Sequence, residues 1–135
     1  KETLFREVCA RRFGELDERI AEARATASDP LDELSSLGAA IVNFALEHRE
    51  AYRLLVAGSD SGTPGVFHHI FMSVENAAAA GVLDGVDPDR AALILWAGIN
   101  GLASSMISFP STDWGDKQEL IAQTMDVLIE GLLST

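Results

Sequence analysis

A chain of 135 residues, 47% of them hydrophobic, is long enough for one domain with a buried core and too apolar to be disordered as a whole. We therefore treat residues 1–135 as a single domain. Its formal net charge of −11 repels nucleic-acid phosphates, so the chain alone is not expected to bind DNA or RNA. One cysteine, Cys9, leaves no disulfide framework and favours a reducing compartment, the cytoplasm.

The first predicted element is a helix that runs from the start of the chain to about Ser28. Six basic and six acidic residues make residues 1–27 neutral, so the rest of the chain carries all of the net negative charge. Apolar side chains recur at spacings of one, three or four residues and form one stripe: Leu4, Phe5, Val8, Cys9, Phe13, Leu16 and Ile20.

Three further helices are each predicted to begin at a capping residue that is followed by proline. The pairs are Asp29–Pro30, Thr63–Pro64 and Asp87–Pro88. Residues 48–56 form a short helix or a bent continuation of the preceding one, and residues 57–65 form a loop by composition. Gly81 is expected near the end of the helix that begins at Pro64.

The helix after Pro88 stands out because the 22 residues from Ala91 to Thr112 carry no charge. Such a run either spans a membrane or is covered by protein. Its serines, its asparagine and the acidic residues that flank it favour the second interpretation, without a membrane. Pro110 is expected to end the helix. Because one small domain covers only one side of it, we expect a second copy of the chain on the other side.

A last helix is predicted after Asp116, which resembles a capping box together with Glu119. No alternating strand pattern is present, so the predicted fold class is all-α with five or six helices. We expect a homodimer built from residues 88–109 and 116–134, burying more than about 1,000 Å² in total. The predicted interface residues are Gly98, Gly101, Ser105, Ile121, Met125, Leu128 and Leu132.

The histidines predict neither a metal site nor a catalytic centre. His68 and His69 are adjacent on a helix, so their side chains point about 100° apart, and His48 lies on another element. No glycine-rich phosphate loop follows a strand, and the acidic residues lie mainly at helix ends. We therefore expect no cofactor, no metal and no catalytic residue.

Asn100 is the strongest candidate for a polar ligand contact, because Trp96 and Ser104 share its helix face. A buried amide needs hydrogen-bond partners, which the backbone, a water, another subunit or a ligand could supply. Core packing with a satisfied amide is the alternative. With aromatic residues of other helices, the predicted ligand-binding set is Phe13, Phe44, Tyr52, Phe67, His68, Phe71, Trp96, Asn100 and Ser104.

Two segments resemble TetR-family transcriptional regulators. The opening KETLFREVCARRF is similar to the stretch that follows their helix-turn-helix, with matches at Lys1, Glu2, Leu4 and Phe5. The segment LWAGINGLASSM (residues 95–106) is similar to a W-x-x-x-H-G-L motif in the penultimate helix of one group, with matches at Trp96, Gly101 and Leu102. Asn100 stands where that group usually has histidine, which argues against ligand chemistry that uses a histidine there.

The resemblance implies a small-molecule sensor. It implies a DNA-binding domain upstream of this chain, through which alone operator DNA is bound, and a dimer formed by the last two helices. It also implies a mostly apolar pocket for a small apolar or amphipathic effector, whose presence the first helix would transmit. Two other functions stay open at this point: a dimerisation module without a ligand, and a helical enzyme that uses His68 or His48.

Overall fold

The computed structural model describes residues 2–57 and 65–133, and these ranges fold into six helices. They are α1 (Glu2–Thr26), α2 (Pro30–Glu47), α3 (Arg49–Ala57), α4 (Gly65–Ala79), α5 (Pro88–Ser108) and α6 (Lys117–Leu133). The described residues contain no strand, so the predicted all-α class is confirmed. Residues 49–57 form a helix of their own, because the chain leaves helical geometry at His48.

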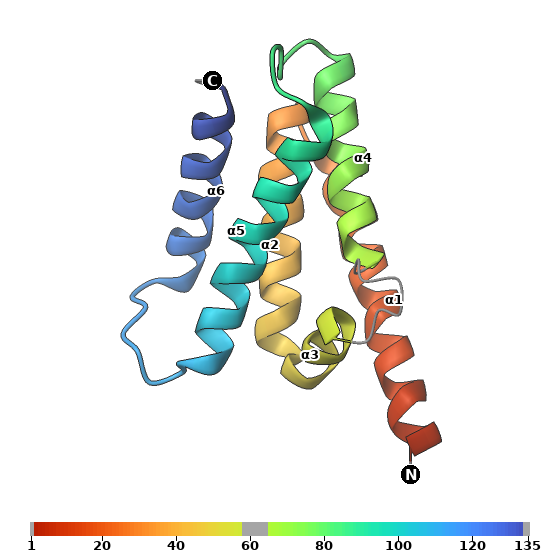
Figure 1. The fold of residues 1–135 in the computed structure, drawn as a ribbon. Helices are drawn as coiled ribbons and strands as arrows, with labels where there is room; N and C mark the ends of the chain where they lie inside the picture. The colour runs from red at the N-terminus through yellow and green to blue at the C-terminus, as the bar shows by residue number, and fades with distance from the viewer. Residues whose placement is uncertain (1, 58–64, 134–135) are drawn as a thin grey trace.

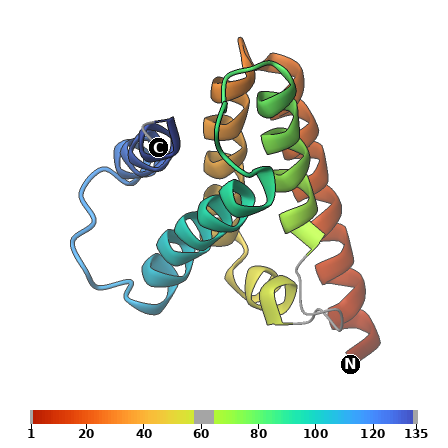
Figure 2. The same ribbon diagram turned by 45° about the horizontal axis from the view of Figure 1, so that its top comes forward.

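Helix α2 is the centre of the bundle and packs against all five other helices. Helices α1 and α4 lie at one edge of the molecule and α6 lies at the opposite edge, as both ribbon views show (Figures 1 and 2). Helix α5 runs between them and packs against α2, α4 and α6. The bundle therefore has a central layer, α2 with α5, and two flanks.

The helix starts predicted at Pro30, Pro88 and after Asp116 are confirmed, but their caps differ. The Asp29 carboxylate accepts a hydrogen bond from the backbone N–H of Asp32 at 2.8 Å, as expected of an N-cap. Asp87 precedes α5 but its side chain makes no capping bond. Asp116 accepts from the backbone N–H of Glu119 at 3.1 Å, while the Glu119 side chain bonds to Gln123 instead, so the capping box is half formed. The predicted start at Thr63–Pro64 lies outside the described residues.

Helix α4 ends in the way that the sequence indicates. Gly81 has a positive φ of 79°, which favours glycine, and its N–H bonds to the carbonyl of Ala78 at 3.0 Å. The N–H of Val82 bonds to the carbonyl of Ala77 at 3.1 Å, which completes a Schellman motif. This turn directs the chain towards the start of α5.

The hydrophobic core lies around α2. Apolar residues of this helix that recur at helical spacing are buried, namely Leu34, Leu37, Ile41, Val42, Phe44 and Ala45, and Leu31 is half-buried. Helix α6 approaches the centre closely at two glycines, since a Cβ on Gly38 would overlap Met125 and a Cβ on Gly98 would overlap Leu128. These two contacts hold α6 against α2 and α5.

The predicted apolar stripe of α1 is only partly covered by the other helices. Cys9, Leu16 and Ile20 are buried, whereas Leu4 and Phe5 are 66% and 47% exposed. The first turns of α1 extend beyond the rest of the bundle (Figure 1). The sequence pattern is helical throughout, but the bundle is shorter than this helix.

Helix α5 is long and apolar enough to cross a membrane by length and composition. The core helix of a helical bundle meets the same criterion. Here one side of α5 is buried against other helices of the chain, and the other side carries Leu93 and Ile94, exposed by 52% and 40%. The apolar residues on the two sides of α5 therefore have different surroundings: one side is buried within the chain and the other is exposed.

Candidate functional site

A chain of polar side chains joins α3 to α5 in the interior. The Tyr52 hydroxyl donates to Oδ1 of Asn100 at 2.7 Å, and the Ser104 hydroxyl donates to the same oxygen at 3.1 Å. Tyr52 is 1% exposed. The amide N–H groups of Asn100 have no partner among the described residues, so they remain free to donate to another molecule.

Tyr52 is a neutral hydrogen-bond donor in this arrangement. Burial raises the pKa of its phenol well above its usual range, because the phenolate would lose its hydration. The phenol therefore keeps its proton across physiological pH. Its hydroxyl satisfies the Asn100 oxygen from a helix that lies 48 residues away in sequence.

A cavity of about 260 Å³ lies next to these polar side chains, between α3 and the C-terminal half of α5. Two predicted ligand-binding residues, Tyr52 and Ser104, lie on its wall. The other lining residues are mainly apolar, apart from a second hydroxyl and one guanidinium: Val56, Ala57, Ile107, Ser108 and Arg53. The cavity therefore offers apolar surface with a few hydroxyl groups.

A second cavity, of about 320 Å³, lies between α1, α3 and α4. Phe13 is the predicted ligand-binding residue that lines it. Asp17 and His69 also line it and form an ion pair at 3.2 Å when the imidazole is protonated. Sequence reasoning missed both, because nothing in the spacing of a residue of α1 and one of α4 indicates that they meet.

The remaining predicted ligand-binding residues do not join these cavities. Phe44 is fully buried in the core, Phe67, Phe71 and Trp96 are half-buried against it, and His68 is exposed. The structure thus brings together Tyr52, Asn100 and Ser104 and places Phe13 elsewhere. That any of these residues binds a ligand stays a prediction.

The residues predicted for the dimer interface fall into two groups. Gly98 packs on Leu128 within the chain, and Ile121, Met125 and Leu132 are buried in the chain's own core. Gly101 is exposed with open space around it, and Ser105 is half-buried. The large apolar residues that the same two helices leave exposed are different ones: Leu93, Ile94, Val127 and Leu133.

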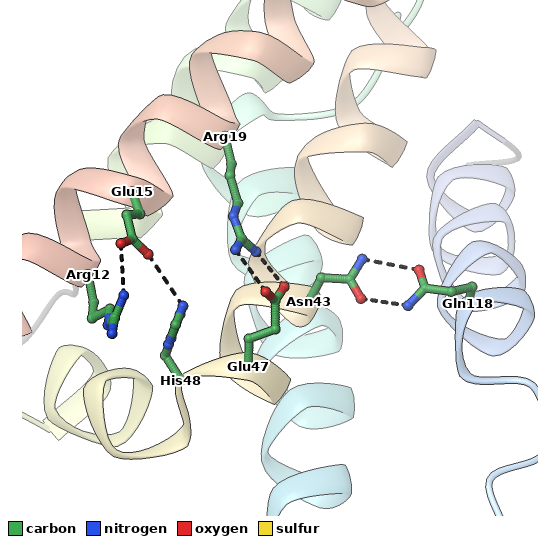
Figure 3. Close-up of polar contacts among 7 residues, drawn as sticks. All are labelled: Arg12, Glu15, Arg19, Asn43, Glu47, His48 and Gln118. Carbon is green, nitrogen blue, oxygen red and sulfur yellow. Dashed lines mark hydrogen bonds and ion pairs between the residues drawn. The ribbon is translucent and has the colours of Figure 1, made fainter.

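Ionic contacts hold the middle of α1 to the corner between α2 and α3 (Figure 3). Arg19 donates two hydrogen bonds to Glu47, at 2.7 and 3.0 Å, and this contact lowers the pKa of that carboxyl. Glu15 accepts from Arg12 at 2.9 Å and lies 3.4 Å from Nε2 of His48. Asn43 and Gln118 exchange two amide hydrogen bonds that tie α6 to α2 (Figure 3).

Beside these contacts, a groove of about 550 Å³ separates the exposed first turns of α1 from the α2–α3 corner. Phe5 and Val8 supply apolar lining, and Arg12 and His48 also line the groove. The residues that the structure describes contain no group of three or more metal-binding side chains. His48 lies 3.4 Å from a carboxylate oxygen of Glu15, and Cys9 lines the same groove.

Comparisons with known proteins agree with this architecture. A solved structure titled "Structure of a protein with unknown function from Rhodococcus sp. RHA1" is similar to the chain with a TM-score of 0.80 and 24% identity, over 98% of this chain and 73% of that one. At this identity the likeness shows the fold. Among curated proteins, no relative matches the chain. Residues 34–128 match the family model described as "Tetracyclin repressor-like, C-terminal domain". Since this match spans α2 to α6, the chain belongs to the family of tetracyclin repressor-like C-terminal domains.

Proposed function

We propose that this chain is the effector-sensing and dimerisation domain of a TetR-like transcriptional regulator in the cytoplasm. The observation that carries the proposal is the α3–α5 cavity, whose wall includes Tyr52 and Ser104, the two residues whose hydroxyls bond to Asn100. Small-molecule sites combine apolar walls with a few placed polar groups, and this cavity has both. The effector is a small apolar or amphipathic molecule that accepts a hydrogen bond.

The dimer in this proposal forms through the outer faces of α5 and α6. Their exposed apolar residues would otherwise remain in water, and two such faces from two copies build a four-helix bundle. Gly101 and Ser105 lie on the outer side of α5, where small side chains permit close approach. The buried residues of α6 pack against α2 and α5 and so hold the outer face of α6 in position.

Helix α1 is the element that would carry the signal. Its exposed apolar start and the groove beside it form a surface for an N-terminal DNA-binding head, which alone would contact operator DNA. The contacts of Arg19 with Glu47 and of Glu15 with His48 fix the middle of α1 to the bundle. Effector binding that favours one position of α1 would shift the population of head spacings.

A dimerisation module without a ligand is the second candidate. The full burial of Phe44 and Tyr52 favours it, because these side chains already fill the centre of the bundle. The two candidates differ in one measurable respect. A sensor gains stability when an effector of suitable chemistry is added, whereas a plain dimerisation module does not.

The test is thermal unfolding of the chain with phenol, 1-decanol and decanoate as probes. A bound probe at 100 times its dissociation constant raises the free energy of unfolding by about 2.7 kcal/mol. Ser104→Ala removes a hydroxyl from the cavity wall and should weaken binding of the responding probe about fivefold. Ser36→Ala, at a half-buried serine of α2 that does not line the cavity, is the matched control. No stabilisation by any probe would support the dimerisation module instead.

A further inference from the structure

We infer that the cavity between α1, α3 and α4 is a second small-molecule site, and that it takes an organic cation such as an aliphatic or aryl-alkyl ammonium. Asp17 binds the cationic group and Phe13 lies beside it on the same wall. Binding itself is independent of the effector site proposed above. Only its consequence for DNA binding rests on the proposed function.

The cavity has the shape and lining for a small amphiphile. Its volume of about 320 Å³ lies at the small end of the range for ligand pockets. Leu16, Leu55 and Val66 supply aliphatic surface from three different helices. Phe13 supplies an aromatic ring, whose face attracts cations. The apolar part of a small amphiphilic ligand can therefore pack against these residues while Asp17 binds its charged end.

The sign of the ligand's charge follows from the hydrogen bonds of His69. The Arg24 guanidinium lies 3.2 Å from Nδ1 of His69, and a guanidinium has only donors. Nδ1 must therefore accept, so the proton is on Nε2, which donates to Asp17 at 3.2 Å. In this tautomer the imidazole is neutral. Asp17 consequently keeps its negative charge without a cationic partner among the described residues.

Arg24 does not neutralise Asp17, because its own bonds point elsewhere. It donates to the backbone carbonyl of His69 at 2.6 Å and to the buried hydroxyl of Ser73 at 3.2 and 3.3 Å. Its charge is balanced by Glu33 on α2, 3.8 Å away. The uncompensated charge on the cavity wall is therefore the carboxylate of Asp17, and an anionic ligand is disfavoured there.

The same contacts predict what a bound cation does to the fold. His69 on α4 holds α1 at two points, Asp17 and Arg24, which lie about two helical turns apart. A cation on Asp17 competes with the Nε2–H of His69, whereas the Arg24 contacts can remain. Occupation of the cavity thus releases the Asp17–His69 link between α4 and α1, the helix that carries the signal in the proposed function, and leaves the links through Arg24 in place.

The experiment is titration calorimetry of the chain with three probes of similar size: 2-phenylethylammonium, neutral 2-phenylethanol and anionic phenylacetate. We expect the cation to bind about fivefold more tightly than the alcohol and the anion to bind least, as one partly exposed ion pair allows. Asp17→Asn should reduce the cation's affinity to that of the alcohol. Glu18→Gln makes an equal charge change at an exposed neighbour that does not line the cavity, so it is the matched control and should change little.

Nitrogen-15 spectra of the histidine rings supply a second readout. The cation should perturb the Nε2–H signal of His69 and leave that of His48 unchanged, because His48 contacts Glu15 on another part of α1. Ser104→Ala should not alter this binding, which separates the site from the α3–α5 cavity. Equal affinity for cation and alcohol, an equal loss in Glu18→Gln, or no binding of any probe would each overturn the inference.

Discussion

Both sides of α5 carry large apolar residues, but their surroundings differ. On the inner side Leu95, Ile99 and Ala103 are at most 1% exposed, because α2, α4 and α6 cover them. On the outer side Leu93 and Ile94 are 52% and 40% exposed. An uncharged helix sequence indicates that both of its sides are covered, but it does not indicate whether the same chain or another molecule covers them. The chain supplies one cover, and we propose that a second copy supplies the other.

The largest expected difference between the two sides is in the cost of removing a leucine. Leu95→Ala leaves a cavity in the core and should lower the free energy of unfolding by about 2–5 kcal/mol. Leu93→Ala should change the stability of the monomer by less than about 0.5 kcal/mol. Urea unfolding at protein concentrations below the dimer dissociation constant compares the two variants directly. Equal losses would mean that the outer side is also covered within the chain.

The hydrogen bond between Tyr52 and Asn100 provides the next test. Asn100→Leu removes the acceptor of the buried Tyr52 hydroxyl and should cost about 1–3 kcal/mol, because that hydroxyl is left without a partner. Adding Tyr52→Phe removes the orphaned group and should restore much of the loss. A double-mutant cycle by urea unfolding measures this coupling. Strictly additive losses would show that the hydrogen bond contributes nothing.

The sequence predicted the helices well because their starts and their spacing are local signals. Asp29–Pro30 and the stripe of α2 needed no knowledge of the rest of the chain. The partner of Asn100 could not be predicted in this way, since only Ser104 is four residues away and Tyr52 arrives from α3. The sequence favoured Ile121 as an interface residue although it is buried within the chain. Both sides of α6 carry apolar residues, so periodicity alone cannot tell the inner side from the outer.

The burial of Tyr52 predicts a specific loss of stability in alkali. Its folded pKa is raised, so the stabilising effect is complete below the unfolded pKa of about 10. Above that pH the unfolded phenol ionises first, and stability should fall by about 1.4 kcal/mol per pH unit until the folded phenol ionises as well. Tyr52 is the single tyrosine in the chain, so phenolate absorbance reports it alone. Tyr52→Phe should remove this pH dependence; a phenolate signal near pH 10 in the folded chain would contradict it.

The smallest effect distinguishes two glycines that lie three residues apart. Gly101→Ala meets open space and should stabilise the monomer by about 0.5–1 kcal/mol through helix propensity, while it weakens a closely packed dimer. Gly98→Ala should gain nothing, because its Cβ overlaps Leu128 and that side chain must move. Thermal unfolding of the two variants, together with their dimer dissociation constants, shows whether the two sides of α5 differ as proposed.

The most direct test of the account is sedimentation equilibrium of the chain at micromolar concentration. A dimer through the outer faces of α5 and α6 predicts a species of twice the 14.5 kDa mass of the chain. Leu93→Glu places a charge on that face and should convert the dimer to a folded monomer. Met72→Glu, at a 41% exposed apolar position of α4 and outside the faces of α5 and α6, serves as a control for the added charge. A wild-type chain that sediments only as a monomer would contradict the claim that a second copy covers the outer side of α5.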